Sequence, residues 1–395
     1  MVSARRRPFF RWLALLFGLV LLRPGFASAR KASLLDPFKE PILKGIDRLM
    51  DRDLEAAEAL FKGLEGQDRT GVIVPLLLSY VQLARTEEKE DPDKDLDRYR
   101  AEMASVIEKV EAALAKSPQD PDLLFLAGMA FGQKGIADGA TKHYLAAYKG
   151  VKKAIRLFEE TLKLDPEQYD AYYGLGLYHY AFSRLPGFYR TLASIILPTG
   201  DREQGLKELH MAAEKGTYAK MLAKVALLRI YGTPEESYEQ ALPLAEELIA
   251  RYPGSPELYF HLSLIYSELG RHPEALGIAE QIRVHIERKE NHFTKVMVPR
   301  YWQLMGKIFM DHGDFSQAIA FFQKAIENGN KRYAWTVAWA WTRMGMIYDL
   351  LGKREEARKH YKMALKVETN SLAQDYAKRY LSEPYQGEKK RRKGG

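Results

Sequence analysis

The clearest hydrophobic pattern in the chain lies near its end, in residues 340–370. Apolar side chains recur there at helical spacing in two stretches, which are separated by Gly352. Counted from Gly345, aromatic residues stand four positions before and three after, and Ala357 and Tyr361 follow at twelve and sixteen. Because small residues let two helices approach closely and aromatic side chains fill the remaining space, the pattern predicts a hairpin of two amphipathic helices.

Further copies of this pattern occur along the chain. The preceding copy keeps every offset, and its members are Trp302, Gly306, Phe309, Gly313, Ala318, Phe322 and Ala325. A copy headed by Gly128 has a lengthened second helix that stops at Pro166, and looser copies contain Tyr259 and Gly45. Another first helix is expected around Gly176. The recurrence predicts one array of stacked hairpins rather than separate globular domains.

These offsets resemble the tetratricopeptide repeat (TPR), whose unit of about 34 residues is a helical hairpin that stacks on its neighbours. Runs of β-branched residues with period two are nearly absent, so strands are not expected. The resemblance implies an all-α, right-handed solenoid over residues 30–382. It also implies a scaffold that binds a protein or peptide, and not an enzyme.

In the TPR family, one face of each first helix lines a concave groove. The matching residues here are Phe125, Met129, Tyr173, Leu177, Tyr180, Phe260, Leu264 and Trp339, with a polar patch at Arg300, Gln303 and Lys307. Aromatic side chains on such a surface are typical anchoring points for a partner. We therefore expect the groove aromatics to serve binding and to contribute little to stability. The family's clamp for peptide carboxyl termini uses Lys and Asn where this chain has apolar residues, which argues against chaperone-tail recognition.

Residues 183–216 interrupt the repeat. Phe188–Leu197 is a mostly apolar stretch, and Asp201 with Gln204 resembles an N-cap pair that begins a helix over Arg202–Lys215. Leu-Pro, Gly-Asp-Arg and Ala-Ala-Glu-Lys-Gly elements make the segment similar to the TPR family that includes eukaryotic mitochondrial outer-membrane and inclusion-clearance proteins. The apolar stretch could bury against a neighbouring hairpin, form a lip of the groove or touch a membrane, but it is too short to span one.

Residues 1–29 have the features of a signal peptide. A basic start precedes the apolar run Trp12–Leu22, and Ala27 and Ala29 form a small-residue cleavage site. The eleven residues of this apolar run are fewer than the roughly 20 that a membrane-spanning helix needs. The segment predicts export to the periplasm or cell envelope of a bacterium, and a mitochondrial presequence is the alternative in a eukaryote. Arg6-Arg7 leaves both the twin-arginine and the general secretory route open.

The charges gather at the two ends of the chain. The net charge is +8, but five positive charges lie in residues 1–29 and five in Lys389–Lys393, so the remaining body carries −2. This distribution gives no reason to expect a specific nucleic-acid partner. We expect residues 383–395 to be a disordered basic tail, with contact to an anionic membrane or polysaccharide surface as the alternative.

The sequence contains few residues or motifs that indicate catalytic, metal or cofactor chemistry. The chain has no Cys, which excludes disulfides and thiolate metal sites, and its nine His form no metal-ligand motif. No cofactor motif is present, so no cofactor is expected. The sequence thus favours an exported, non-catalytic scaffold that acts in cell-envelope assembly. A membrane-surface structural protein, held by the apolar insertion and the basic tail, is the second hypothesis.

Amino-terminal sequencing of the exported protein is expected to give Arg30 as the first residue. Ala27 and Ala29 suit the small-residue pockets of a signal peptidase, and Pro24-Gly25 ends the apolar helix just before them. An intact Met1 recovered from the membrane fraction would contradict this prediction and favour a membrane anchor.

Overall fold

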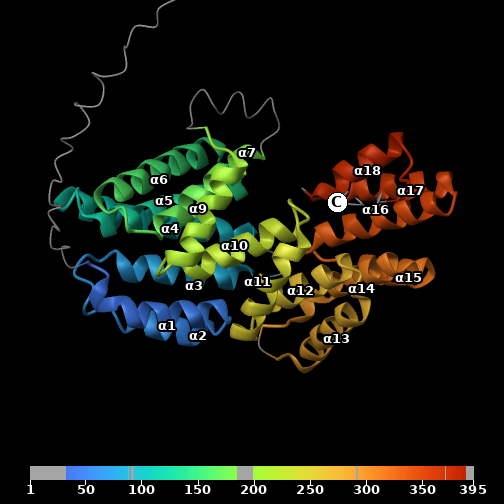
Figure 1. The fold of residues 1–395 in the computed structure, drawn as a ribbon, viewed down its shortest axis with the longest axis horizontal. Helices are drawn as coiled ribbons and strands as arrows, with labels where there is room; N and C mark the ends of the chain where they lie inside the picture. Colours follow the sequence, from blue (N-terminus) through green and yellow to red (C-terminus); the bar gives the residue numbers. More distant parts are fainter. Residues whose placement is uncertain are drawn as a thin grey trace, which may run out of the picture.

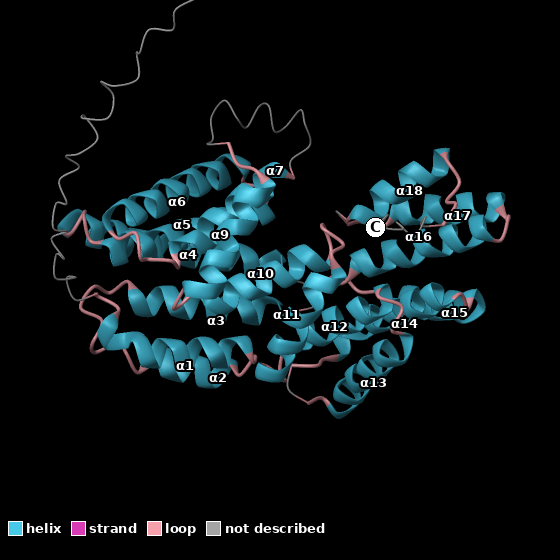
Figure 2. Cartoon of the chain, viewed as in Figure 1, coloured by secondary structure: helices cyan, strands magenta, loops and turns pink. Residues whose placement is uncertain are grey.

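The computed structural model describes residues 33–387, except 88, 90–92, 185–198, 291 and 370. This part of the chain contains 17 α-helices and no strand (Figure 2). None of the described helices combines the length and the apolar character needed to cross a membrane. The signal peptide, the apolar stretch Phe188–Leu197 and the basic run Lys389–Lys393 lie outside the described residues and stay predictions.

The helices follow one another as packed pairs (Figure 1). The first pairs are α1 (Lys39–Met50) with α2 (Leu54–Lys62), α3 (Ile73–Glu87) with α4 (Asp93–Lys116), α5 (Pro121–Ala140) with α6 (Tyr144–Leu164), and α7 (Ala171–Ser183) with α9 (Arg202–Lys215). The next are α10 (Lys220–Gly232) with α11 (Tyr238–Arg251), α12 (Pro256–Glu268) with α13 (His272–Arg288), α14 (Val298–His312) with α15 (Phe315–Glu327), and α16 (Ala334–Leu350) with α17 (Arg354–Lys366). Helix α18 (Leu372–Ser382) covers the last pair, and short 3-10 helices η1 (Asp36–Phe38) and η2 (Lys295–Met297) precede α1 and α14. The predicted all-α solenoid of stacked hairpins is confirmed.

The hairpins are held together at glycines that meet aromatic rings. A Cβ atom on Gly345 would lie 2.5 Å from Cε1 of Tyr361, whose side chain is fully buried. The same arrangement pairs Gly45 with Phe61, Gly128 with Phe158 and Gly306 with Phe322. No other residue type leaves room for the ring, because any Cβ would overlap it. For Gly45, Gly306 and Gly345 the ring lies at the predicted offset of 16 residues, whereas for Gly128 it comes from Phe158, 30 residues on, and Tyr144 at the predicted offset is exposed.

The interruption of the repeat falls inside one hairpin. Helix α9 begins at Arg202, where Asp201 accepts a hydrogen bond from the backbone N–H of Gln204. It packs against α7 so closely that a Cβ on Gly205 would lie 2.5 Å from the backbone nitrogen of Tyr180. Helix α9 is thus the second helix of the hairpin that α7 begins, and residues 185–198 connect the two.

The sequence did not predict the hairpin of α3 and α4. Its contact is filled from α4 by Tyr99 and Met103, which lie one helical turn apart and are almost completely buried. Helix α3 opens with the β-branched residues Ile73 and Val74, which resemble a strand more than a helix. Without a glycine at the contact, the pair lacked the feature that identified the other hairpins.

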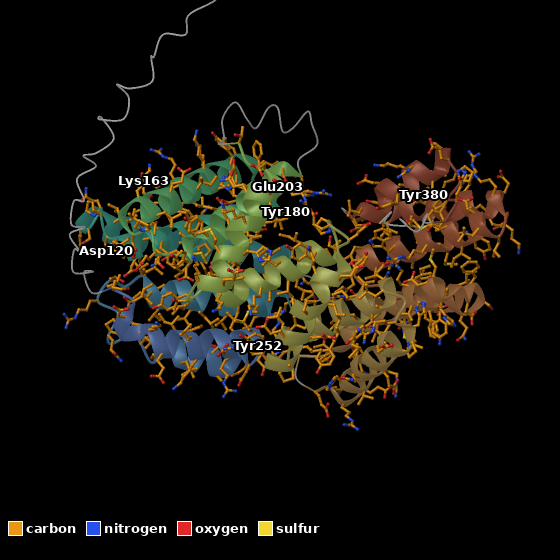
Figure 3. The ribbon with its side chains drawn as sticks, in the orientation of Figure 1. Asp120, Lys163, Tyr180, Glu203, Tyr252 and Tyr380 are labelled. Carbon is orange, nitrogen blue, oxygen red and sulfur yellow. The ribbon has the colours of Figure 1, made fainter. Side chains whose placement is uncertain are left out.

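The solenoid turns back on itself, so that its first helix contacts the turn between α11 and α12 (Figure 1). Asp47 of α1 accepts hydrogen bonds from Tyr252 Oη at 2.6 Å and Arg251 Nη2 at 3.0 Å. The backbone N–H of Gly254 donates to Asp51 at 2.6 Å. Tyr252 lies beside the blue α1/α2 hairpin in Figure 3. About 200 residues of chain separate the partners, and nothing in the sequence predicted their contact.

Replacement of Gly345 by Leu should lower the free energy of unfolding by about 1–3 kcal/mol or more, because the new side chain must displace the ring of Tyr361. Ala357→Leu, at a fully buried position on α17, should behave in the same way. Urea unfolding measures the effect.

Gly277→Ala is the matched control. Gly277 lies in α13, and a Cβ there would meet nothing within 4 Å. Alanine should therefore stabilise the helix by up to about 1 kcal/mol. Losses below about 0.5 kcal/mol for both leucine variants would show that these helices do not cross at Gly345.

Candidate functional site

A hollow of about 620 Å³ lies between α12, α14 and α16, the first helices of three successive hairpins. We call it the main hollow. Six of the predicted groove residues line it: Phe260, Leu264, Arg300, Gln303, Lys307 and Trp339. They come from three helices and from positions up to 79 apart in the chain. The stacking of hairpins is what brings them to one surface.

The carboxylate of Glu257, at the start of α12, is held by Arg300 and lies beside His261. Arg300 Nη1 lies 2.5 Å from Oε2, and His261 Nε2, one helical turn further along α12, lies 3.2 Å from Oε1. Burial alone would raise the pKa of Glu257, but these two partners outweigh it and hold the pKa well below its ordinary value. Glu257 is therefore ionised and already engaged within the protein.

Lys307 is a second buried cation on the wall of the main hollow. Its ammonium lies 2.8 Å from Glu268 and 2.6 Å from Asp311. Burial would lower the pKa of Lys307, but the two carboxylates raise it above the ordinary value. The Lys307 side chain therefore stays charged, and its two carboxylate partners hold the ammonium group in place.

Aromatic rings and guanidinium groups alternate across the main hollow. The Arg300 guanidinium lies 4.1 Å from the ring centre of Phe260 and 5.8 Å from that of Trp335. Arg343 lies 4.6 Å from the ring centre of Trp339. Each contact is a cation–π interaction, which fixes the ring and the charge relative to one another. The wall is thus a pre-ordered surface of flat apolar groups and positive charges.

A smaller hollow of about 260 Å³ adjoins the main one. We call it the side hollow, and it shares Glu257, Arg332 and Tyr333 with the main hollow. Arg52 and Arg229 line its other side. Because three residues border both spaces, the two form one continuous depression, which we call the cationic trough. Six Lys and Arg side chains line the trough, against the single carboxylate of Glu257.

A third space lies in the amino-terminal half and is entirely apolar. This chamber of about 70 Å³ is enclosed by α1, α3, α5 and α10, and its lining includes Ile42, Ile46, Leu76, Phe125, Met129 and Leu222. It has no polar lining surface. The predicted groove therefore divides into an apolar part and a charged part.

The remaining predicted residues lie on α7, outside both spaces. Tyr173 and Leu177 are half-buried against the core. Tyr180 is buried, and its hydroxyl donates to Glu235 Oε1 at 2.7 Å. Whether any of these side chains binds a partner stays a prediction.

Three of the predicted groove aromatics are buried, so we now expect them to contribute to stability. Phe125 and Phe260 are 3% exposed and Tyr180 is 6% exposed. Phe125 is enclosed because α1 and α10 close over it, which the turning back of the solenoid makes possible. Phe260 is covered by Arg300, and Tyr180 packs into the core between α7, α9 and α10. These aromatics are structural.

Sequence reasoning also missed several trough residues. Trp335 and Arg343 stand four positions either side of Trp339, so they lie on one face of α16 and could have been found from that spacing. Arg229 and Arg332 carry no such signal, because they come from different hairpins. Among the described residues, no group of three or more His, Asp or Glu is placed to hold a metal ion.

Stacked hairpins with this glycine and aromatic pattern define a TPR protein, and a TPR family model matches residues 150–188. The model described as Iml2/Tetratricopeptide repeat protein 39 matches residues 171–392, more than half of the chain. The protein belongs to this family. The resemblance noticed in residues 183–216 is thereby confirmed, and it extends far beyond them.

Several solved structures are also similar, at low identity. A TPR protein from Parabacteroides merdae is 15% identical, with 74% of this chain and 93% of that one covered and a TM-score of 0.34. Yeast Tom70 is 12% identical over 88% and 89%, with a TM-score of 0.40. The human IFIT1 dimer with m7Gppp-AAAA is 14% identical over 88% and 85%, with a TM-score of 0.45. No curated protein gives a significant match to the sequence.

Phe260→Ala and Phe125→Ala should each lower the free energy of unfolding by about 3–5 kcal/mol, the usual cost of emptying a buried phenylalanine site. Arg332→Gln, on the wall of the trough, should change it by less than about 0.5 kcal/mol. Urea unfolding of the three variants distinguishes the two classes. If the phenylalanine variants left the free energy of unfolding nearly unchanged, these rings would instead be surface anchors for a partner.

Proposed function

We propose that this protein is an exported, non-catalytic scaffold that binds an extended segment of a protein partner in the cationic trough. The proposal rests on the main hollow, where three successive first helices present Leu264, Trp339 and buried polar groups on one pre-ordered surface. A preformed surface loses little conformational entropy on binding, so more of the contact energy appears as affinity. TPR proteins generally bind protein partners, which supports the same conclusion.

The proposed cellular place rests on residues 1–29, whose charge pattern favours export to the periplasm or cell envelope of a bacterium. There the scaffold would hold components of an envelope assembly. The second candidate, a structural protein at a membrane surface, depends on Phe188–Leu197 and Lys389–Lys393. It predicts that deletion of the basic run abolishes association with the envelope.

The test is photo-crosslinking in the native host. A photoreactive phenylalanine analogue replaces Leu264, which is half-buried on the wall of the main hollow. The same analogue at Lys359, on the outer face of α17 with 68% of its side chain exposed, is the matched control. We expect a discrete crosslinked species from position 264 alone, in the envelope fraction.

The crosslink should disappear when Trp339→Ala is added, since hot-spot aromatics typically contribute about 2 kcal/mol or more to binding. Equal crosslinking from both positions, or none from position 264, would contradict the scaffold proposal. A crosslink found only in another cell fraction would support the scaffold function but contradict the proposed role in the envelope. Loss of envelope association on deletion of Lys389–Lys393, with no crosslink at 264, would favour the second candidate.

A further inference from the structure

We propose that the cationic trough selects an acidic peptide segment, with carboxylate side chains bound by Arg229 and Arg332 and apolar side chains bound against Leu264 and Trp339. This inference rests on the proposed scaffold function and adds the chemical class of the partner. It goes beyond the overall charge of the protein, whose body without its two ends is slightly negative.

The first argument is the charge that the trough retains after its internal pairs are formed. Glu257 is engaged by Arg300 and His261. Glu268 and Asp311 stand beside Lys307. No further carboxylate lines either hollow, whereas Arg229 and Arg332 do. The trough therefore attracts anions even though the rest of the body does not.

The second argument comes from two of those arginines. Arg229 of α10 and Arg332, just before α16, form no ion pair with any carboxylate of the described residues. Both line the side hollow, and Arg332 also borders the main one. A guanidinium presents five donors in a planar fork that matches a carboxylate, so two such groups in one depression form a specific site for acidic side chains.

The third argument separates an acidic peptide from a single-stranded nucleic acid, the other common polyanion. Nucleic-acid grooves combine positive charge with open aromatic faces on which bases stack. In the main hollow Arg300 lies over Phe260 and Arg343 lies over Trp339, so guanidinium groups already cover these faces. Leu264 and Trp339 also line the main hollow, and they suit the aliphatic side chains of a peptide.

The test measures binding of two pools of fluorescein-labelled dodecapeptides to the purified full chain by fluorescence anisotropy. The pools share the same apolar positions, and the others are Asp and Glu in one pool and Asn and Gln in the second. We expect the acidic pool to bind at least about tenfold more tightly, a difference of about 1.4 kcal/mol. The difference should shrink as salt screens the trough.

The double variant Arg229→Gln and Arg332→Gln should remove this preference. It should still fold, because neither arginine pairs with a carboxylate of the described chain. Lys359→Gln, on the outer face of α17, is the matched control and should retain the preference.

Equal binding of the two pools would overturn the inference, and so would an acidic preference that survives the double variant. Oligouridylate or phosphatidylserine vesicles could instead bind more tightly than the acidic pool. If the double variant abolished that binding, the inference would be overturned in favour of another polyanion. A partner that crosslinks at position 264 without competition from the acidic pool would reject the acidic class and leave the scaffold function standing.

Discussion

The close contact between paired helices is the constraint on which the rest of the structure depends. At Gly345 and its equivalents, an aromatic ring from the second helix occupies the space where a Cβ would stand. This contact fixes how far apart the two helices lie and how each hairpin is tilted against the next. Because each hairpin repeats nearly the same geometry, the first helices gather on the inner side of the solenoid. The main hollow lies between α12, α14 and α16, which are the first helices of three successive hairpins.

A second constraint acts at long range and makes the two halves of the inner surface different. Asp47 of α1 and Asp51, which follows α1, bind the turn between α11 and α12, which brings the solenoid back to its first hairpin. In this half, the chamber lined by Phe125 and Met129 is small and its surface is apolar. Beyond the turn, the lining of the inner surface is charged.

The buried cations on the wall of the trough are neutralised by carboxylates of the same or the preceding hairpin. Arg300 and Lys307 lie two turns apart on α14, and each is compensated by carboxylates from its own or the preceding hairpin. Since these pairs are formed inside the protein, they order the wall before any partner arrives. Arg229 and Arg332 form no ion pair with a carboxylate of the described residues. Both line the side hollow, and Arg332 also borders the main one.

The sequence by itself determined what depends on neighbouring segments. The glycine and aromatic offsets around Gly345 predicted the hairpins that contain Gly45 and Gly306, since both sides of the contact lie within one repeat at a spacing of 16 residues. In the hairpin of Gly128 the ring comes from Phe158, 30 residues on, because both helices are longer. The same offsets found the polar patch on α14. The sequence did not predict the hairpin of α3 and α4, because Tyr99 and Met103 fill its helix contact without a glycine.

Only the tertiary structure decided which groove positions are buried and which residues surround them. The burial of Phe125 and the pairing of Asp47 with Tyr252 depend on the total rotation accumulated over several hairpins. A small difference in tilt at each hairpin adds up along the solenoid, and no local pattern in the sequence records that sum.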